Sequence, residues 1–363
     1  MVVLGSTGSI GCLALEIARQ FGKPIEAMSA GKNITLFNEQ ILAYRPKFVA
    51  IANECDIPRL ESQGAEIFVG DKGICAMLER TQSQLVINAI VGFAGLLPSL
   101  HIQKLGKTLA LANKESLVSG GWLLDTKAII PIDSEHFGLW YLRNDRSIKR
   151  LVITASGGAF RDTPLESIYA QTKKTALQHP NWQMGQKITI DSASMANKLF
   201  EILEAFWLFG CKSIEAFIER SSSIHALIEF LDGSTTAHFA LPDMRLPIAY
   251  AINPCQAAHT QILESIDLSK LAALQFAPID SKRYPLYVLK ERLLENPKLG
   301  VIVNASNEAA IDHFLADRIC FGEIANMVFE ALTVFEKKLG TLADYEAIVS
   351  LDAEVRKYCC KLL

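Results

Sequence analysis

Two acidic residues separated by one position could hold a divalent cation. Asp133 and Glu135 follow the apolar run AIIPI at residues 128–132. If the run is a strand that continues through them, both carboxylates point to the same face and converge where the strand ends. Converging carboxylates repel each other unless a cation lies between them or one is protonated. An all-oxygen site suits Mg²⁺ or Mn²⁺ better than zinc. Since a solvated or helix-capping acidic pair is a common alternative, the metal hypothesis needs a third ligand.

The candidate third ligand is Glu201, in a segment expected to be a helix over residues 192–209. Asn197 and Lys198 precede it by four and three positions, so the three side chains share one helix face. One alternative is a surface ion pair between Lys198 and Glu201. Against it, the neighbouring apolar residues leave the first turns little solvent-facing surface: Leu199, Phe200, Ile202 and Leu203. We therefore expect the polar face to line a cleft.

A second group of residues could bind a phosphate. The run Ala155-Ser156-Gly157-Gly158 ends a predicted strand with a hydroxyl and two glycines, and backbone N–H groups of such a loop can cradle an anion. Ser192 is expected at the start of the 192–209 helix, where the helix dipole favours negative charge. Asn197 and Lys198 would add an amide donor and a positive charge.

The segment HPNWQMGQ at residues 179–186 lies between these phosphate-binding candidates. Tryptophan and methionine beside proline and glycine suggest a lid loop, with bounds 178–188, that closes over a ligand and excludes water. The alternative is a loop that packs permanently on the core.

A glycine turn, GSTGSIG at residues 5–11, joins the first expected strand to the first expected helix. Glycines allow a sharp turn and remove the Cβ atoms that would block a phosphate, which then meets the helix N-terminus. This position favours a dinucleotide over a plain tight turn. The second strand ends in Ser29-Ala30-Gly31-Lys32-Asn33, with no carboxylate for a ribose 2′-hydroxyl. Lys32 instead favours the 2′-phosphate of NADPH, unless it is an ordinary surface lysine.

The elements that must position these residues predict an α/β protein. Short apolar runs alternate with amphipathic segments up to about residue 133, which is typical of a parallel Rossmann-like sheet covered on both faces. Its strands are expected at 2–4, 25–30, 48–52, 66–70, 85–92, 108–113 and 128–133.

The middle of the chain is expected to be α+β and its end helical. Residues 151–160 and 187–194 are strand-like, and 224–241 predicts an antiparallel hairpin that turns at Asp232-Gly233. Helices are expected at 197–209, 284–294, 304–314, 321–335 and 343–356. We predict an NADPH-binding Rossmann-like domain (1–122), a central α+β catalytic and metal-binding domain (123–255), a linker (256–281) and a C-terminal helical bundle (282–363).

Composition restricts the class of partner. Of 363 residues, 50% are hydrophobic and 21% charged, with a net charge of −3, so no bulk electrostatic attraction draws the chain to nucleic acid or to a membrane. The longest uncharged stretch, 81–103, contains Asn88, Gly92 and Pro98 and is not expected to span a bilayer. The eight cysteines never form C-x-x-C, and MVVLGSTG carries no secretion signal. We expect reduced thiols and a cytoplasmic location.

Seven motifs, in order, make the chain closely resemble the 1-deoxy-D-xylulose 5-phosphate reductoisomerase family. They are GSTGSIG (5–11), AGKN (30–33), LANKES (111–116), DSEH (133–136), ASGG (155–158), HPNWQMGQKITIDSASMANK (179–198) with Glu201, and MRLPIAYA (244–251). Two departures stand out: only four residues precede Gly5, so the start could lack a few residues, and the C-terminal bundle matches little beyond NASNE (304–308).

The resemblance implies site residues, some of which the residue patterns alone do not reach. For the NADPH coenzyme it implies Thr7, Gly8, Ser9, Ile10, Gly31, Lys32, Asn33, Asn113, Glu115 and Gly185. For Mg²⁺, Mn²⁺ or Co²⁺ it implies Asp133, Glu135 and Glu201. For the substrate it implies Lys114, Ser134, Glu135, Ser156, His179, Trp182, Met184, Ser192, Asn197, Lys198 and Glu201. Lys114, Glu135 and His179 would be catalytic.

The implied activity is rearrangement and NADPH-dependent reduction of 1-deoxy-D-xylulose 5-phosphate to 2-C-methyl-D-erythritol 4-phosphate, which feeds isoprenoid synthesis. The resemblance also suggests a homodimer. Two alternatives stay open. One is another Rossmann-domain NADPH oxidoreductase, similar to homoserine dehydrogenase, which needs no carboxylate triad. The other is a non-catalytic NADPH sensor without metal dependence.

Overall fold

The structure is a computed structural model that describes residues 1–182, 184–270 and 273–362. Residue 183 of the expected lid loop and residues 271–272 of the expected linker lie outside the described residues. The chain groups into two compact units. Unit 1 comprises Met1–Ser116, Leu124–Ser134 and Asp243–Glu264, and unit 2 comprises Leu117–Leu123, Glu135–Pro242 and Ser265–Leu363.

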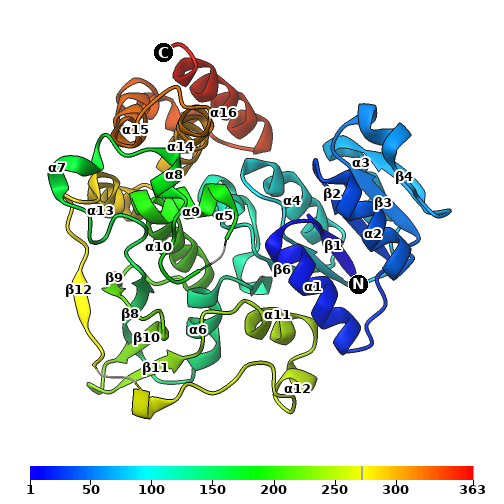
Figure 1. Ribbon diagram of the computed structural model, residues 1–363, viewed down its shortest axis with the longest axis horizontal. Helices are drawn as coiled ribbons and strands as arrows, with labels where there is room; N and C mark the ends of the chain where they lie inside the picture. The colour runs from blue at the N-terminus through cyan, green and yellow to red at the C-terminus, as the bar shows by residue number, and fades with distance from the viewer. Residues whose placement is uncertain (183, 271–272, 363) are drawn as a thin grey trace. The chain divides into compact units, whose positions relative to one another are not determined.

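Unit 1 is built on a seven-stranded parallel sheet of order β4-β3-β2-β1-β5-β6-β7, as Figure 1 shows for its labelled strands. The strands are β1 (Val2–Leu4), β2 (Ala27–Ala30), β3 (Phe48–Ile51), β4 (Glu66–Val69), β5 (Leu85–Asn88), β6 (Thr108–Leu111) and β7 (Ile130–Pro131). The sequence order reverses between β1 and β5, and such a switch point is where α/β sheets bind ligands beyond their carboxyl ends. Gly5 directly follows β1 at this point.

Helices cover both faces of this sheet, as in other parallel sheets. Val2, Val3 and Leu4 of the central strand are therefore fully buried. The helices are α1 (Ser9–Gln20), α2 (Ile34–Tyr44), α3 (Gly70–Arg80), α4 (Leu96–Lys104), α11 (Arg245–Ile252) and α12 (Pro254–Ala257), with 3-10 turns at Glu54–Arg59, Phe93–Gly95 and Thr126–Ala128. Helix α5 (Lys114–Gly120) runs from unit 1 into unit 2. The predicted α/β fold is confirmed.

Unit 2 contains a five-stranded sheet of order β11-β10-β8-β9-β12, in which only β8 and β9 are parallel. Its strands are β8 (Ile148–Ala155), β9 (Ile214–Glu219), β10 (Ile224–Phe230), β11 (Thr235–Phe239) and β12 (Phe276–Pro278). The predicted hairpin turn is confirmed: Gly233 has a φ of +87°, and Asp232 accepts the N–H of Ser234 at 2.8 Å.

The prediction of a helical C-terminal region is confirmed, and its helices belong to unit 2. The helices of unit 2 are α6 (Ser134–Leu142), α7 (Leu165–Ile168), α8 (Lys173–Ala176), α9 (Gln186–Ser194), α10 (Ala196–Phe209), α13 (Lys290–Glu295), α14 (Leu299–Leu315), α15 (Phe321–Phe335) and α16 (Tyr345–Cys359), with 3-10 turns at Gly121–Leu123, Leu268–Lys270, Pro285–Leu289 and Glu336–Thr341. Among the described residues, no helix is long and apolar enough to cross a membrane.

The prediction of a strand at residues 187–194 is wrong, because this segment forms helix α9. Its β-branched residues favour a strand locally, but tertiary packing overrides that propensity. In the helix, Ile190 and Ala193 are buried, Lys187 pairs with Asp191 one turn later, and the Thr189 hydroxyl donates to the Gly185 carbonyl at 2.9 Å.

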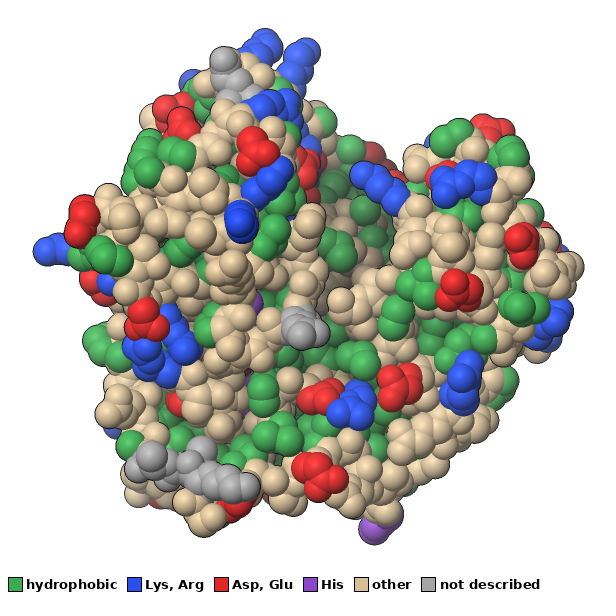
Figure 2. All heavy atoms as spheres, in the orientation of Figure 1, with side chains coloured by type: hydrophobic (Ala, Val, Ile, Leu, Met, Phe, Trp, Pro, Cys, Tyr) green, Lys and Arg blue, Asp and Glu red, His purple; other side chains and the backbone are tan. Residues whose placement is uncertain are grey.

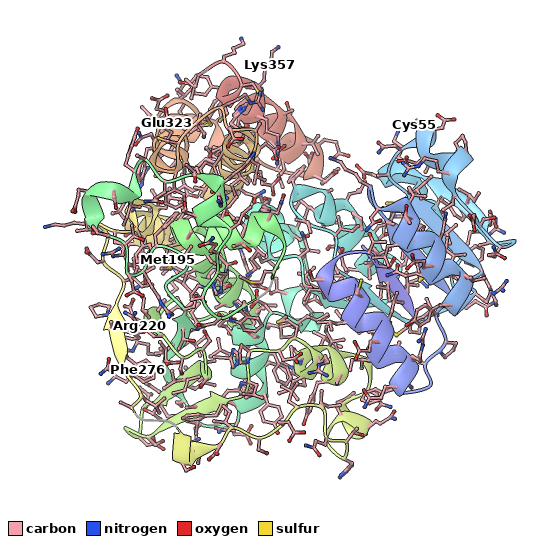
Figure 3. All side chains as sticks on the ribbon, viewed as in Figure 1. Cys55, Met195, Arg220, Phe276, Glu323 and Lys357 are labelled. Atoms are coloured by element: carbon pink, nitrogen blue, oxygen red, sulfur yellow. The ribbon has the colours of Figure 1, made fainter. Side chains whose placement is uncertain are left out.

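The helix expected to begin at Ser192 begins instead at Ala196. Met195, labelled in Figure 3 between α9 and α10, has a φ of +66° and separates the two helices. Two strands, β9 and β12, were not predicted. Of these, β12, which carries the labelled Phe276, lies in the expected linker, and its three exposed residues give no alternating apolar signal.

Acidic and basic side chains are interspersed over the face drawn in Figure 2. This mixing agrees with the net charge of −3. It gives that face no continuous positive surface for a polyanion to follow.

The packing of the glycine turn generates a stability prediction. Alanine normally stabilises a helix interior relative to glycine. At Gly11 of α1, however, an added Cβ would lie 2.2 Å from the Gly5 carbonyl oxygen. Gly11→Ala should therefore lower the free energy of unfolding by roughly 1–3 kcal/mol, measured by urea denaturation. Gly340→Ala, whose Cβ would meet nothing within 4 Å, is the control. Equal stability of the two variants would contradict the crowding.

Candidate functional site

The glycine turn of unit 1 has the shape of an anion cradle. Gly5 has a φ of +76°, and a Cβ there would lie 2.6 Å from the Ala89 carbonyl oxygen, so only glycine fits. Gly8 is the N-cap of α1, and no side chain caps the helix. Thr7, Gly8 and Ile10 are half-buried, and Ser9 is exposed. The first-turn N–H groups of α1 are thus placed to meet a negatively charged group.

The end of β2 presents a positive charge at the same edge of the sheet, because β2 lies beside β1 in parallel. Gly31, Lys32 and Asn33 are exposed. The Asn33 side chain accepts the N–H of Leu36 at 3.2 Å and caps α2, so its oxygen already has a structural partner. This geometry keeps Lys32 as the candidate that recognises a 2′-phosphate.

Asn113 is a structural centre of unit 1. Its buried amide donates to the carbonyls of Ile90 at 2.7 Å and Gly92 at 2.8 Å, and to Glu115 at 3.1 Å. Its oxygen accepts the N–H of Ser116 at 3.0 Å. The side chain therefore fixes the loop that follows β5 to the start of α5. Gly185, in unit 2, is the N-cap of α9.

The acidic pair converges, but the expected extended geometry is wrong. Strand β7 ends at Pro131 and helix α6 begins at Ser134, so Glu135 lies in a helical first turn, where the dipole stabilises a carboxylate. One carboxylate oxygen from each of Asp133, Glu135 and Glu201 lies within 4.8 Å of the other two. Three oxygen donors so close together fit a hard divalent cation.

Two lysines accompany these carboxylates. Lys198 Nζ lies 2.6 Å from Glu135 Oε1 and also pairs with Glu201, while Lys114 pairs with Asp133. Lys198 and Glu201 are buried, which excludes the surface ion pair as an interpretation. Burial opposes the charge on Lys198, but the attraction of Glu135 and Glu201 outweighs it and raises the pKa of Lys198. Asn197 also donates to Glu201.

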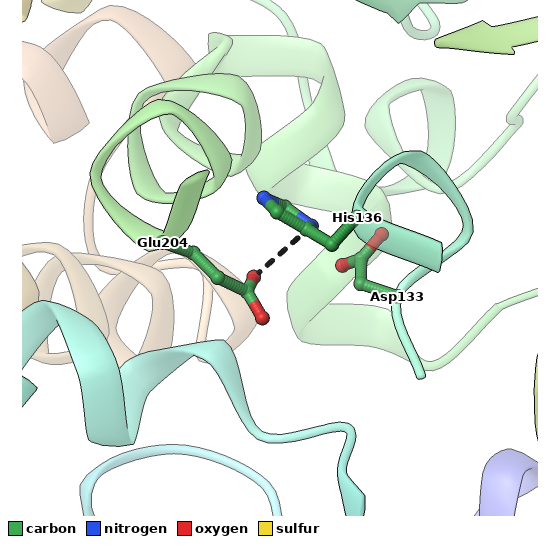
Figure 4. A group of neighbouring side chains, drawn as sticks. All are labelled: Asp133, His136 and Glu204. Atoms are coloured by element: carbon green, nitrogen blue, oxygen red, sulfur yellow. Dashed lines mark ion pairs between the residues drawn. The ribbon is translucent and has the colours of Figure 1, made fainter. Parts of the chain in front are cut away.

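A histidine and a glutamate that the sequence reasoning missed lie behind Glu201. The imidazole of His136 is 2.8 Å from the Glu201 carbonyl oxygen through Nε2 and 3.4 Å from the Glu204 carboxylate through Nδ1, as Figure 4 shows for the second pair. Both side chains are fully buried. His136 follows the acidic pair directly, and Glu204 lies one turn after Glu201; these spacings were the available signal.

The phosphate-binding candidates lie in unit 2, where His179 contacts Ser156. The imidazole Nδ1 accepts backbone N–H groups from Asn181 at 3.2 Å and Trp182 at 2.9 Å, so the proton lies on Nε2, 2.9 Å from Ser156 Oγ. Burial, with a contribution from Arg161, lowers the pKa of His179 to about 4, so the ring is neutral at pH 7. Ser156 Oγ also accepts the Gly158 N–H at 3.2 Å. With two donors on this oxygen, the hydroxyl proton is what Ser156 can offer a ligand.

Ser192 lies in the last turn of α9, so its expected place at a helix N-terminus is wrong. Asn197 and Lys198 occupy the first turn of α10 instead. The Gly158 loop packs against Ser192, because a Cβ on Gly158 would lie 2.5 Å from the Ser192 carbonyl oxygen. The structure thus brings the 155–158 loop to the junction of α9 and α10.

The expected lid loop is anchored at its first half. Asn181 donates to Ser222 Oγ at 2.7 Å and to the Arg220 carbonyl at 2.8 Å. The Trp182 ring meets the edge of His225 at a centroid distance of 6.1 Å, and Met184 is half-buried. Closure of the loop stays a prediction.

Family models match three consecutive parts of the chain. Residues 1–121 match 1-deoxy-D-xylulose 5-phosphate reductoisomerase, residues 129–209 match its C-terminal domain, and residues 239–358 match a further DXP reductoisomerase C-terminal domain.

Curated relatives with this name cover nearly the whole chain. A Helicobacter pylori protein is 56% identical over 360 residues, which is 98% of each chain, and a Wolinella succinogenes protein is 51% identical over the full length of both. Among experimental structures, a DOX-P reductoisomerase in complex with NADPH, fosmidomycin and magnesium has a TM-score of 0.90 at 31% identity, covering 99% of this chain and 97% of that one. The Zymomonas mobilis enzyme in complex with NADPH has a TM-score of 0.85 at 32% identity, covering 99% and 98%. The chain therefore belongs to the 1-deoxy-D-xylulose 5-phosphate reductoisomerase family.

Proposed function

We propose that this chain converts 1-deoxy-D-xylulose 5-phosphate to 2-C-methyl-D-erythritol 4-phosphate, with NADPH and a divalent metal ion, in non-mevalonate isoprenoid biosynthesis. The observation that carries the proposal is the convergence of the Asp133, Glu135 and Glu201 carboxylates. A homoserine-dehydrogenase-like oxidoreductase or an NADPH sensor would have no use for this group of converging carboxylates.

The metal site would consist of these three carboxylates, with Mg²⁺, Mn²⁺ or Co²⁺ bound. A cation held there supplies Lewis-acid polarisation of the substrate's carbonyl and adjacent hydroxyl. Lys114, Ser134 and Glu135 would contact the same carbonyl and hydroxyl groups. Lys114 and Lys198 form ion pairs with these carboxylates and so offset their mutual repulsion.

The phosphate of the substrate would bind at the junction of α9 and α10. The Ser156 hydroxyl, whose oxygen accepts the Nε2 proton of His179, would supply a neutral donor. Asn197 and Lys198 would supply an amide and a charge at a helix N-terminus. Ser192 would complete the pocket. Trp182 and Met184 would close over the bound substrate and exclude water.

The coenzyme would bind along the edge of the parallel sheet in unit 1. Its pyrophosphate would meet Thr7, Gly8, Ser9 and Ile10, and its 2′-phosphate would meet Gly31, Lys32 and Asn33. Asn113, Glu115 and Gly185 would line the nicotinamide end. The Asn113 hydrogen bonds support a role for that residue in shaping the wall.

Three further predictions accompany this function. We propose a homodimer, which the exposed Phe239 on the edge strand β11 supports. We also propose a cytoplasmic location and functional domains divided at residues 122, 255 and 281.

The deciding assay for the activity is oxidation of NADPH with deoxyxylulose phosphate, with and without a chelator. Activity that survives complete metal removal would contradict the proposal.

Loss of one metal ligand should separate turnover from coenzyme binding. Glu201→Gln should lower kcat more than about 100-fold, because the amide removes a charged ligand, while NADPH affinity measured by fluorescence stays unchanged. Glu330→Gln, at an exposed glutamate of α15, is the matched control. Full activity of Glu201→Gln would remove Glu201 from the site.

Reversal of the charge at Lys32 should change coenzyme preference. Lys32→Asp should weaken NADPH binding at least about tenfold, since a carboxylate then repels the 2′-phosphate, and leave NADH binding nearly unchanged. Lys23→Asp, an exposed lysine of unit 1, is the control in the same titrations. An equal loss for both coenzymes would mean that Lys32 does not distinguish them.

The lowered pKa of His179 predicts a loss of stability in acid. Between its ordinary value of 6.5 and about 4, the unfolded chain binds a proton that the folded chain does not. The unfolding free energy from His179 is therefore fully present above pH 6.5 and declines as the pH falls toward 4. His179→Gln should flatten this decline in urea titrations at several pH values, whereas His259→Gln, at an exposed histidine, should not. Identical pH profiles for both variants would refute the assignment.

A further inference from the structure

Helix α9 carries a buried carboxylate that the proposed reaction does not use. Asp191 is 2% exposed, and its two oxygens have different partners. Oδ1 accepts the Asn307 amide at 2.7 Å, and Oδ2 pairs with Lys187 at 2.8 Å. Asn307 is fully buried in the middle of α14, 116 residues further along the chain. The bond therefore ties the C-terminal helices to the short helix that ends in the phosphate-binding candidate Ser192.

Helix α9 needs such external support. It has nine residues, no side-chain cap at its N-terminus and a left-handed residue, Met195, at its C-terminus. An isolated helix of that length is unstable in water, so its position depends on tertiary contacts.

The contacts of α9 hold two different parts of its last turns. On one side, the Gly158 backbone lies so close to Ser192 and Ala193 that a Cβ would approach within 2.5–2.8 Å. The Asp191 carboxylate is held by α14. The Asp191 carbonyl also accepts the Ser194 hydroxyl at 3.3 Å, and Ser194 Oγ accepts the Ala196 N–H at the start of α10 at 3.3 Å. Asp191 is thus joined by hydrogen bonds to the turn that leads to Asn197 and Lys198.

The bond to Asn307 is directional, unlike an apolar contact. A buried carboxylate that loses a hydrogen-bond donor pays a desolvation cost, so the amide fixes both the distance and the rotation of α9 relative to α14. A small rotation of α9 would move Ser192 away from the loop that carries Ser156.

We infer that Asp191 and Asn307 are positioning residues that hold α9 so that Ser192 and the first turn of α10 face the substrate phosphate. This inference rests on the proposed function and deepens it: the C-terminal helices take part in substrate binding without touching the substrate. The amide-to-carboxylate bond is the physical link.

A comparison of KM with kcat tests the inference. Asn307→Ala should raise the KM for deoxyxylulose phosphate by roughly tenfold or more. The reason is that a shift of α9 weakens a hydrogen bond to the charged phosphate, and such a bond contributes about that much to binding. The kcat and the NADPH affinity should stay within about twofold of the wild-type values. Asn304→Ala is the matched control: Asn304 is equally buried on α14, and no partner is seen for its amide among the described residues. It should lower stability without raising KM. Equal KM changes in both variants, or none in Asn307→Ala, would overturn the inference.

An exchange of the two side chains keeps the test decisive if Asn307→Ala folds poorly. Asn307→Asp places two carboxylates face to face and should raise KM strongly. Adding Asp191→Asn restores one amide and one carboxylate and should recover most of the loss. No recovery would contradict the direct link. Ser192→Ala identifies the source of a failure: if it raises KM in an active enzyme while the Asn307 variants do not, only this inference fails. An inactive wild-type chain would instead refute the proposed function.

Discussion

The mutual repulsion of three desolvated carboxylates is the constraint that the site has to satisfy. Removing a charged group from water costs several kcal/mol unless a partner compensates. Asp133, Glu135 and Glu201 lie within 4.8 Å of one another, and Lys114 and Lys198 form ion pairs with them. In the proposed function the cluster supplies the oxygen ligands that a hard cation prefers.

Helix α10 carries residues of both the proposed cation site and the proposed anion site. Asn197, Lys198 and Glu201 lie on one face within two turns, and a helix rises only about 1.5 Å per residue, so the distance between the two subsites is fixed. The proposed reaction breaks and re-forms a carbon–carbon bond, so both fragments must stay in place. A rigid helix that binds the phosphate at its first turn and carries a metal ligand one turn later would provide that restraint.

The sequence alone predicts those features that depend on local periodicity. The alternation of strand-like and helix-like segments predicts the parallel sheet, and the glycines from Gly5 to Gly11 predict the turn, because both patterns lie within a few residues. Residues 187–194 mislead since Ile188, Thr189 and Ile190 favour a strand locally, whereas packing makes them helical. The carboxylates converge as expected, but at the start of α6 rather than along a strand. The spacings of His136 and Glu204 place each near a candidate ligand, but they do not show that the two residues pair. Asp191 and Asn307 are likewise a long-range pair that no local pattern identifies.

Several donors of the proposed phosphate pocket are neutral groups. A neutral His179, fixed in one tautomer by two backbone N–H groups, is a directional donor that carries no positive charge. Hydroxyl, imidazole and helix N–H groups would recognise the phosphate by geometry, together with the charge of Lys198. The burial that lowers the pKa of His179 would therefore keep the donors on this side of the proposed phosphate pocket neutral.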